Sequence, residues 1–240
     1  MMKIAVLSDI HGNYIALKTV LEEAKQQKVE HLFLLGDQIG YFYRALEVFE
    51  LIKEWSYSMI SGNHERLFLE YLDASELRKN EINKSYGRCF SHYKSHFSKA
   101  LITEIRQLPE QKIIKKEGFS FLLCHGSLND KDKYIYPDTS PKVLEENDLK
   151  DLDFIFNGHT HYPMVYKGKY SLFVNVGSVG QSRTVGGIAN WGIINTKNGV
   201  YIPQSTPYNI SEVESELKFF KEKKEYLFKI LKRNNKNYES

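Results

Sequence analysis

The sequence of 240 residues predicts an α/β protein in which two packed β-sheets carry helices on their outer faces. Residues 3–60 alternate short apolar runs with amphipathic segments, an order that produces a parallel sheet with crossover helices. Later strand patterns mostly follow one another through short turns, which favours antiparallel pairing. Between these parts, residues 64–106 are polar and tyrosine-rich, and their pattern is helical.

The elements of the first part follow from the spacing of its apolar residues. We expect, in chain order, strand 3–8, helix 14–27, strand 31–35, helix 43–55 and strand 57–60. Asn13 is a suitable N-cap for the first helix. Residues 64–106 are interpreted as a helical excursion that ends at Pro109 and caps a site beside it.

The second part contains shorter elements. We expect strands 111–116 and 119–124, helix 141–149, and then strands 153–156, 163–167, 170–175, 190–195 and 200–203. The first two strands form a hairpin that turns at Glu117-Gly118, and Pro141 lies in the first turn of the helix. No linker or internal repeat interrupts the chain, so residues 1–240 are expected to form one domain.

Residues 211–233 are predicted to form one C-terminal helix. Ser211 and Glu214 fit a capping box, and apolar residues recur along one side of the segment. This stripe predicts a helix that docks on the domain, and a helix that binds a partner is the alternative.

The composition excludes several classes of protein. A net charge of +3 is too small to indicate a nucleic-acid or anionic-membrane partner. Cys89 and Cys124 form neither a metal-type pair nor a disulfide framework, and Cys124 is expected to face the core. The N-terminus lacks signal-peptide features, and no apolar run approaches the roughly 18–20 residues of a membrane helix. We therefore expect a cytoplasmic protein without a membrane partner.

Residue types that bind metals follow five of the predicted strands. The fragments are Asp9-Ile10-His11, Gly36-Asp37, Gly62-Asn63-His64, Cys124-His125-Gly126 and Gly158-His159-Thr160-His161. Strand ends form the rim at which ligands bind in such sheets. Carboxylate oxygen and imidazole nitrogen together suit Mn²⁺, Fe, Co²⁺, Ni²⁺ or Zn²⁺ better than Ca²⁺. The two histidines of the last fragment converge only where the backbone bends, which Gly158 allows.

Each fragment alone also has an ordinary structural interpretation. Gly36-Asp37 is compatible with a plain turn, Asn63 with a helix N-cap, and His125 with a hydrogen-bonded core histidine. Five such fragments at strand ends in one chain are improbable as accidents, so we predict a metal site. The remaining histidines are interpreted as surface or structural residues: His31, His92 and His96.

The ordered fragments resemble the motifs of calcineurin-like metallophosphoesterases, a superfamily of binuclear-metal phosphatases and phosphodiesterases. The matching motifs are D-x-H, G-D, G-N-H-[DE], a single strand-end histidine and G-H-x-H, and they span residues 9–161. Residues 175–180 also resemble a stretch of small bacterial members, although Val176 stands where those members usually have proline. The resemblance implies a four-layer α/β/β/α sandwich of two mixed β-sheets flanked by helices.

The resemblance also implies a role for each motif residue. The ligands of two divalent ions would be Asp9, His11 and His161 for one ion, Asn63, His125 and His159 for the other, and Asp37 as the bridge. His64 would contact the substrate as a general acid or as a donor to a phosphate oxygen. Mn²⁺ is the first choice of metal, with Fe, Zn²⁺, Ni²⁺ or Co²⁺ as alternatives.

The activity implied by the resemblance is hydrolysis of a phosphate ester by in-line attack of a metal-bound hydroxide. A phosphodiesterase is the first choice, because small bacterial members of this kind often cleave diesters. A phosphomonoesterase or a dinucleoside-polyphosphate hydrolase is the alternative. The expected substrate is a small phosphate ester or a nucleotide, with no specific nucleic-acid partner, and the sequence sets no oligomeric state.

A glycine-rich loop contains candidates for binding the phosphate of the substrate. Arg183 is the first candidate, although it is also compatible with an ordinary solvated loop arginine, and Gln181 is a weaker candidate. Some relatives, such as the metallophosphoesterase-like subunit of retromer, use this fold as a non-catalytic scaffold, and a mononuclear hydrolase is a third possibility. All seven ligand positions and His64 are present here, which favours a binuclear enzyme.

Overall fold

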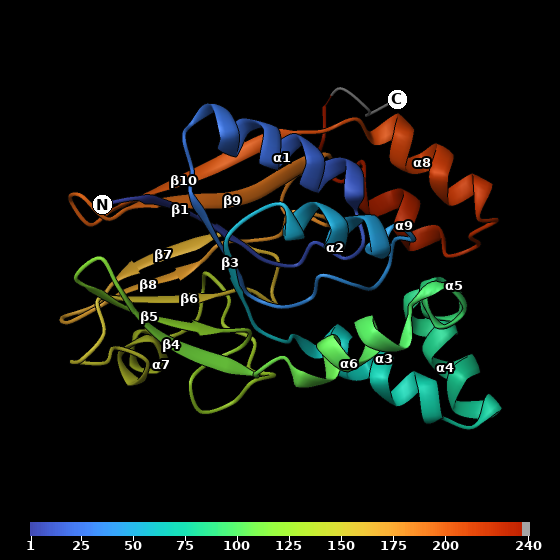
Figure 1. Ribbon diagram of the computed structural model, residues 1–240, viewed down its shortest axis with the longest axis horizontal. Helices are drawn as coiled ribbons and strands as arrows, with labels where there is room; N and C mark the ends of the chain where they lie inside the picture. Colours follow the sequence, from blue (N-terminus) through green and yellow to red (C-terminus); the bar gives the residue numbers. More distant parts are fainter. Residues whose placement is uncertain (237–240) are drawn as a thin grey trace.

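Two five-stranded sheets face each other at the centre of the molecule in the computed structural model, which describes residues 1–236 (Figure 1). The first sheet has the order β10-β9-β1-β2-β3, formed by Val200–Pro207, Ile188–Asn195, Lys3–Leu7, His31–Leu34 and Tyr57–Met59. The second has the order β4-β5-β6-β8-β7, formed by Gln111–Lys116, Phe119–Cys124, Phe154–Asn157, Leu172–Asn175 and Met164–Lys167. Each sheet contains parallel and antiparallel pairs, so both sheets are mixed.

Three hydrophobic clusters correspond to the three interfaces between four layers. Along β1, Ala5 and Leu7 face the cluster shared with the outer helices, whereas Ile4 and Val6 face the cluster between the sheets. This alternation follows from the two-residue period of a strand. The third cluster joins the second sheet to Leu144 of the helix α7 (Pro141–Glu146). The expected α/β/β/α order is therefore confirmed.

The pairing of the later strands differs from the expectation in one respect. β7 and β8 form the predicted antiparallel pair, and β9 and β10 complete the first sheet beside β1. However, β5, β6 and β8 are parallel to one another. The prediction of antiparallel late strands was wrong here, because β5 reaches β6 through a long connection that contains α7 rather than through a tight turn.

The helices of the first half occupy two places. α1 (Tyr14–Gln26) and α2 (Ala45–Lys53) pack on the first sheet, and Asn13 caps α1 by accepting from Ala16 N at 3.1 Å, as predicted. The excursion is helical, as predicted, and contains α3 (Asn63–Asp73), α4 (Glu76–Tyr86), α5 (Cys89–His96) and α6 (Lys99–Gln107). These four helices lie together at one end of the sheets, at the lower right of Figure 1.

The C-terminal segment is not one helix, so the prediction for residues 211–233 was wrong. It contains α8 (Ile210–Phe219) and α9 (Glu225–Ile230). Lys221 between them has a left-handed φ of 53°, and Glu222 accepts from the backbone N–H groups of Lys223 and Lys224 at 2.7 Å each. These interactions turn the chain and interrupt the helical hydrogen bonds.

Other details of this segment also differ from the expectation or confirm it. The N-cap of α8 is Asn209, which accepts from the N–H groups of Ser211 and Glu212, so Ser211 is not the cap. Apolar side chains of both helices, among them Val213, Leu217 and Leu227, belong to the cluster of the first sheet, which confirms that the segment docks on the domain. Cys124 faces the core as expected. None of the helices within residues 1–236 has the length and apolar content to cross a membrane.

His31, at the start of β2, is buried in the fold away from the candidate ligands. Its side chain lies between Ser56 Oγ at 2.8 Å and Ser58 Oγ at 3.2 Å, and the residue is 5% exposed. Burial lowers the pKa of His31 to about 4, and the positive charges of Lys116 and Lys112 act in the same direction. The folded protein therefore holds this imidazole in its neutral form at neutral pH.

We predict that His31 reduces the stability of the protein in mild acid. In the unfolded chain its pKa is about 6.5, so below that pH the unfolded state binds a proton that the folded state does not, until the pH reaches the folded-state value. The free energy of unfolding should therefore fall more between about pH 7 and about pH 4.5 in the wild type than in His31→Gln. Urea unfolding across this range measures the difference, and parallel curves for the two proteins would contradict the assignment.

Candidate metal centre

The predicted metal ligands meet at one edge of the two sheets. Each follows the end of a parallel strand: Asp9 and His11 follow β1, Asp37 follows β2, Asn63 follows β3, His125 follows β5, and His159 and His161 follow β6. All are buried except Asn63, which is half-buried. The structure therefore brings these seven side chains and His64 together, whereas His31, His92 and His96 lie elsewhere.

Asp9, His11 and His161 form the first group of side chains able to bind a metal. Their ligand atoms lie within 4.8 Å of one another. The Nε2 atom of His161 is 3.1 Å from Asp9 Oδ1 and 3.1 Å from the Nε2 atom of His11. Burial alone would raise the pKa of Asp9, but the neighbouring histidines outweigh it and hold this pKa well below its usual range. Asp9 is thus a buried carboxylate that faces two imidazole nitrogens.

Asn63, His125 and His159 form the second group. The Nε2 atom of His125 lies 3.0 Å from Asn63 Oδ1. His159 contributes a ligand atom within 4.8 Å of those of Asp37 and His125, and its buried Nε2 has no hydrogen-bond partner. Asn63 is the first residue of α3, while Gly62 is the N-cap, so the alternative of Asn63 as a helix cap is wrong.

Asp37 lies between the two groups. Its Oδ2 atom is 3.3 Å from the Nε2 atom of His125 and 3.9 Å from the Nε2 atom of His11. Its Oδ1 atom accepts from the backbone N–H of His64 at 2.7 Å. Burial alone would raise the pKa of Asp37, but His125 and His64 outweigh burial and keep it well below its usual range. This side chain is therefore ionised and in contact with a histidine of each group.

Backbone carbonyl groups orient three of the histidines. The Nδ1 atoms of His11, His125 and His161 lie 3.1, 2.8 and 2.7 Å from the carbonyl oxygens of Ile39, Leu35 and Gln181. Because a carbonyl oxygen can only accept, Nδ1 of each ring must carry a proton and donate it. In the neutral ring, Nε2 then presents a lone pair toward the centre, which is the usual arrangement of a metal-binding histidine.

These tautomers test whether the residues fit metal ions. With Nδ1 donating in both neutral rings, the Nε2 atoms of His11 and His161 are two acceptors 3.1 Å apart, and added positive charge, from a proton or a metal ion, relieves their repulsion. Ionised Asp37 outweighs burial and raises the pKa of His125 to about 10, so this cluster attracts positive charge. The buried histidine and aspartate clusters are thus consistent with a binuclear metal site.

The backbone of the ligand loops adopts an unusual conformation. Five candidate ligands have left-handed φ values between 54° and 68°: Asp9, His11, Asp37, His159 and His161. Such a conformation costs about 1–3 kcal/mol per residue outside glycine. The bend between His159 and His161 therefore lies in the histidines themselves and not, as we expected, in Gly158. Gly158 instead provides space, because a Cβ there would lie 2.4 Å from Asp9 Oδ2.

Glu65 organises the loops that carry Asp37 and Asn63, a role that the sequence analysis missed. Its carboxylate accepts from the backbone N–H groups of Asp37, Gln38 and Gly62 at 2.8 Å and of Ile39 at 3.2 Å. Burial raises the pKa of Glu65 to about 7, and the N–H donors only partly oppose this rise. The fourth position of the G-N-H-[DE] motif was the available signal for this residue.

His64 lies beside both groups. It shares a cluster of potential ligands with His11 and Asp37, and its ring is surrounded by those of His11, Tyr41 and Tyr86 at 4.7, 4.7 and 5.1 Å between centroids. Burial lowers the pKa of His64 to about 3. Its buried Nδ1 atom has no hydrogen-bond partner. His64 is therefore a neutral imidazole with a free nitrogen next to the centre.

Arg183 and Gln181 occupy the loop after β8. A guanidinium nitrogen of Arg183 donates to the carbonyl oxygen of Thr160 at 3.4 Å, and the side chain is half-buried. Gln181 supplies the carbonyl group that orients His161, and its side-chain Oε1 accepts from Tyr226 of α9 at 3.2 Å. The structure thus holds Arg183 next to the G-H-x-H loop, while Gln181 acts through its backbone.

The family model of the calcineurin-like phosphoesterase superfamily domain matches residues 2–199. The chain belongs to this superfamily. It is therefore a metallophosphoesterase-family hydrolase, and the matched residues include every candidate ligand and His64.

Two curated relatives of this metallophosphoesterase differ in how they are described. An uncharacterized protein of Methanocaldococcus jannaschii is 29% identical over 214 residues, with 75% of this chain and 77% of that protein covered. Serine/threonine-protein phosphatase 2 of Escherichia coli is 22% identical over 195 residues, with 74% of this chain and 88% of that protein covered.

Solved structures share the fold of the metallophosphoesterase over nearly its whole length. A hypothetical protein from Pyrococcus horikoshii has a TM-score of 0.81 at 21% identity, with 97% of this chain and 98% of that chain covered. A metallophosphoesterase from Sphaerobacter thermophilus has a TM-score of 0.78 at 22% identity, with 96% and 98% covered. Two mixed sheets with flanking helices are thus the architecture of known metallophosphoesterase structures.

We predict that Glu65→Gln weakens both the fold and the metal centre. The amide would present N–H groups to two of the four backbone donors, leaving them unpaired at a cost of about 2 kcal/mol in unfolding free energy. Because the ligand loops would shift, metal affinity should fall roughly 10- to 100-fold. Urea unfolding and metal titration measure these effects. Glu70→Gln on the exposed side of the same helix is the control, and equal behaviour of the two variants would refute the role of Glu65.

We also predict that Asp37→Ala loses metal as well as activity. The substitution removes the carboxylate that contacts a histidine of each group, so neither ion would keep its full set of ligands. Metal analysis after dialysis against Mn²⁺ should give fewer bound ions than in the wild type. Asp151→Ala, at an exposed position, should retain the wild-type content. Wild-type metal content in Asp37→Ala would exclude a bridging role.

Proposed function

We propose that the protein is a binuclear metal-dependent phosphodiesterase that acts on a small phosphodiester or nucleotide. The observation that carries this proposal is the pair of ligand groups in contact with the same carboxylate oxygen of Asp37. Asp9, His11 and His161 would hold one ion, and Asn63, His125 and His159 the other. Mn²⁺ is the first choice, because the ligands combine hard oxygen with imidazole nitrogen.

The charge balance of this centre favours a phosphate group. When bound, two divalent ions supply Lewis acidity toward phosphoryl oxygens and lower the pKa of a coordinated water to about 7. Asp9 and Asp37 neutralise only part of their charge, so the centre stays positive where an anionic substrate binds. Burial of the ligands excludes bulk water and strengthens this electrostatic attraction.

His64 and Arg183 are proposed to act on the phosphate from two directions. His64 is neutral and buried, so it donates an N–H hydrogen bond to a phosphate oxygen, and a bound anion favours its protonation for transfer to the leaving group. Arg183, held at the G-H-x-H loop, offers its remaining N–H groups to a second phosphate oxygen. Both residues orient the ester, and neither is needed to hold metal.

A phosphomonoesterase is the alternative function. The Escherichia coli relative is named as a serine/threonine-protein phosphatase, which supports this alternative. We favour a diesterase because a hollow lined by Tyr136 and Tyr162, the residue after His161, offers room for a second ester substituent. We also propose that the chain forms a single domain, because one hydrophobic cluster contains residues from both ends of it. We propose that the protein works in the reducing cytoplasm, because both cysteines are buried free thiols.

We expect hydrolysis that depends on added metal and prefers a diester. Chelator-stripped protein should be inactive, and Mn²⁺ should restore turnover of bis(p-nitrophenyl) phosphate at least about tenfold above that of p-nitrophenyl phosphate, a difference of about 1.4 kcal/mol in the barrier. Release of p-nitrophenol measures both rates. Faster cleavage of the monoester would select the alternative, and no cleavage of either compound with any tested divalent metal would refute the proposal.

We expect His64→Ala to keep both ions but lose most turnover. Loss of a proton donor in the transition state typically costs about 10²–10⁴-fold in rate. Steady-state kinetics and metal analysis on the same preparation separate the two effects. His96→Ala, an exposed histidine of α5, is the matched control and should behave as the wild type. Full activity with intact metal content in His64→Ala would exclude the proposed role.

A further inference from the structure

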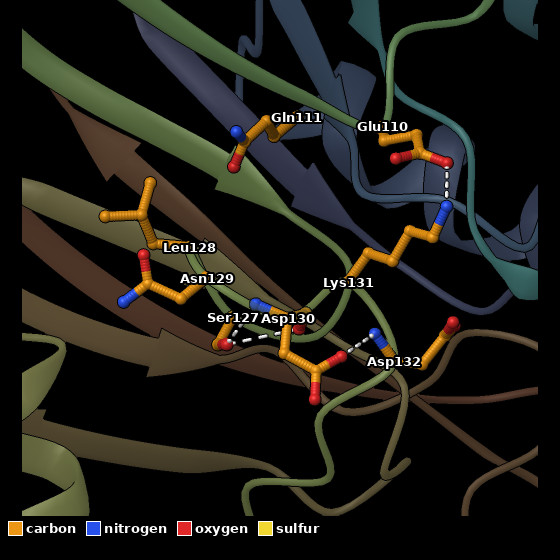
Figure 2. Close-up of a pocket in the computed structure, with 8 residues that line it drawn as sticks. All are labelled: Glu110, Gln111, Ser127, Leu128, Asn129, Asp130, Lys131 and Asp132. Atoms are coloured by element: carbon orange, nitrogen blue, oxygen red, sulfur yellow. Dashed lines mark hydrogen bonds and ion pairs between the residues drawn. The ribbon is translucent and has the colours of Figure 1, made fainter.

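Two hollows adjoin the loop that leaves the metal centre after β5, and they differ in chemistry. Figure 2 shows the first, of about 400 Å³, lined by Glu110, Gln111 and residues 127–132. Some of its polar groups pair with one another: Lys131 with Glu110, and Ser127 with Asp130. Among the described residues, no aromatic ring lines this hollow, so it offers no surface on which a flat ligand could stack. Residues 127–132, which line this hollow, connect His125 to Tyr134 along the chain.

The second hollow has a volume of about 470 Å³ and an aromatic lining. It is lined by Tyr136, Pro137, Asp138 and Tyr162. Tyr162 directly follows His161, so the hollow adjoins the G-H-x-H loop. The rings of Tyr136 and Tyr162 are 6.0 Å apart and inclined at 63°. The two rings therefore form two sides of the hollow that are inclined to each other.

A continuous series of rings connects this hollow to the metal centre. The ring of Tyr134 lies 4.0 Å from that of His159 at an interplanar angle of 31°. The ring of Tyr136 is nearly parallel to that of Tyr134, at 5.8 Å and 10°. Tyr136 is thus linked to the candidate metal ligand His159 through a single intervening ring, that of Tyr134.

Buried and hydrogen-bonded backbone positions hold the segment that carries these tyrosines, while the tyrosines themselves stay accessible to solvent. Ile135 between them is fully buried in the cluster of the second sheet, whereas both flanking tyrosines keep a large part of their surface exposed. Tyr136 is also fixed by reciprocal hydrogen bonds with Thr139, at 2.9 and 3.0 Å. Tyr134 and Tyr136 are nevertheless 49% and 36% exposed. The fold therefore anchors the segment without using the rings in its core.

We propose that Tyr134, Tyr136 and Tyr162 form a stacking subsite for a nucleobase carried by the phosphoester whose phosphate lies at the metal centre. Aromatic faces bind bases by stacking, and Asp138 at the same hollow offers an acceptor for an exocyclic amino group. The inference rests on the proposed function, because it places the phosphate at that centre. It narrows the substrate class to nucleotides with an amino-bearing base.

Equilibrium binding tests the subsite without relying on turnover. The ligands are adenosine 5′-monophosphate and ribose 5-phosphate, which share the phosphate and the sugar but differ in the base. Calorimetry uses the full-length, Mn²⁺-loaded His64→Ala protein, so that neither ligand is consumed. The adenosine ligand should bind roughly 5- to 100-fold more tightly, the range expected for stacking of one base on aromatic side chains.

Variants identify the rings responsible. Added to this protein, Tyr136→Ala should abolish the preference for the base without changing the Kd of ribose 5-phosphate, whereas Tyr136→Phe should keep it. Tyr170→Ala is the matched control, since this exposed tyrosine lies in the β7–β8 turn at the opposite edge of the second sheet. A preference that survives Tyr136→Ala, or equal affinity for the two ligands before substitution, would overturn the subsite.

The same measurements distinguish failure of the subsite from failure of the proposed function. Metal-dependent diester hydrolysis by the wild type without a preference for the base would overturn the subsite alone. A preference that depends on Tyr136, in a protein whose wild type hydrolyses no ester, would support the subsite and refute the proposed activity. Absence of binding by both ligands would overturn the subsite.

Discussion

The properties of the candidate metal centre depend on buried hydrogen-bond acceptors that lie opposite one another at one edge of the two sheets. Carbonyl groups of Ile39, Leu35 and Gln181 accept hydrogen bonds from the Nδ1–H groups of three histidines and thereby turn the Nε2 atoms of these rings toward the centre. Two carboxylates join them in surroundings from which water is excluded. Such an arrangement is unfavourable without positive charge, so the chemistry of the site follows from how the protein orients its own backbone.

The order of the strands brings the candidate ligands together, and the loops after the strands orient their side chains. Parallel strands in both sheets end at one edge, so short segments from β1, β2, β3, β5 and β6 meet there. A strand end alone does not aim a side chain, however. Left-handed backbone conformations at five candidate ligands turn their side chains toward the centre. The packed sheets and the hydrogen bonds to Glu65 must offset the conformational free energy that these conformations cost.

Local sequence was sufficient for most strands and helices and for finding the candidate ligands at strand ends, but not for interactions between distant segments. Strand periodicity and the residue types after each strand are local signals, and the resemblance to a family added the order of the motifs. The break between α8 and α9 had no such signal. Glu222 at this break also accepts from Tyr43 and from the N–H of Arg88, and contacts so remote are invisible to a helical pattern. The pairing of β5 with β6 and β8 likewise depends on the whole sheet.

Under the proposed function, the wide separation of the candidate ligands along the chain would couple the stability of the protein to the supply of metal ions. Residues 9 and 161 meet only after both sheets have packed, so an ion that needs both binds the native chain and not the unfolded one. At a free concentration of about one hundred times its Kd, such an ion would add about 2.7 kcal/mol to the free energy of unfolding. Scarcity of the ion would then expose more of the chain to proteases. A cell would lose the protein itself along with its activity.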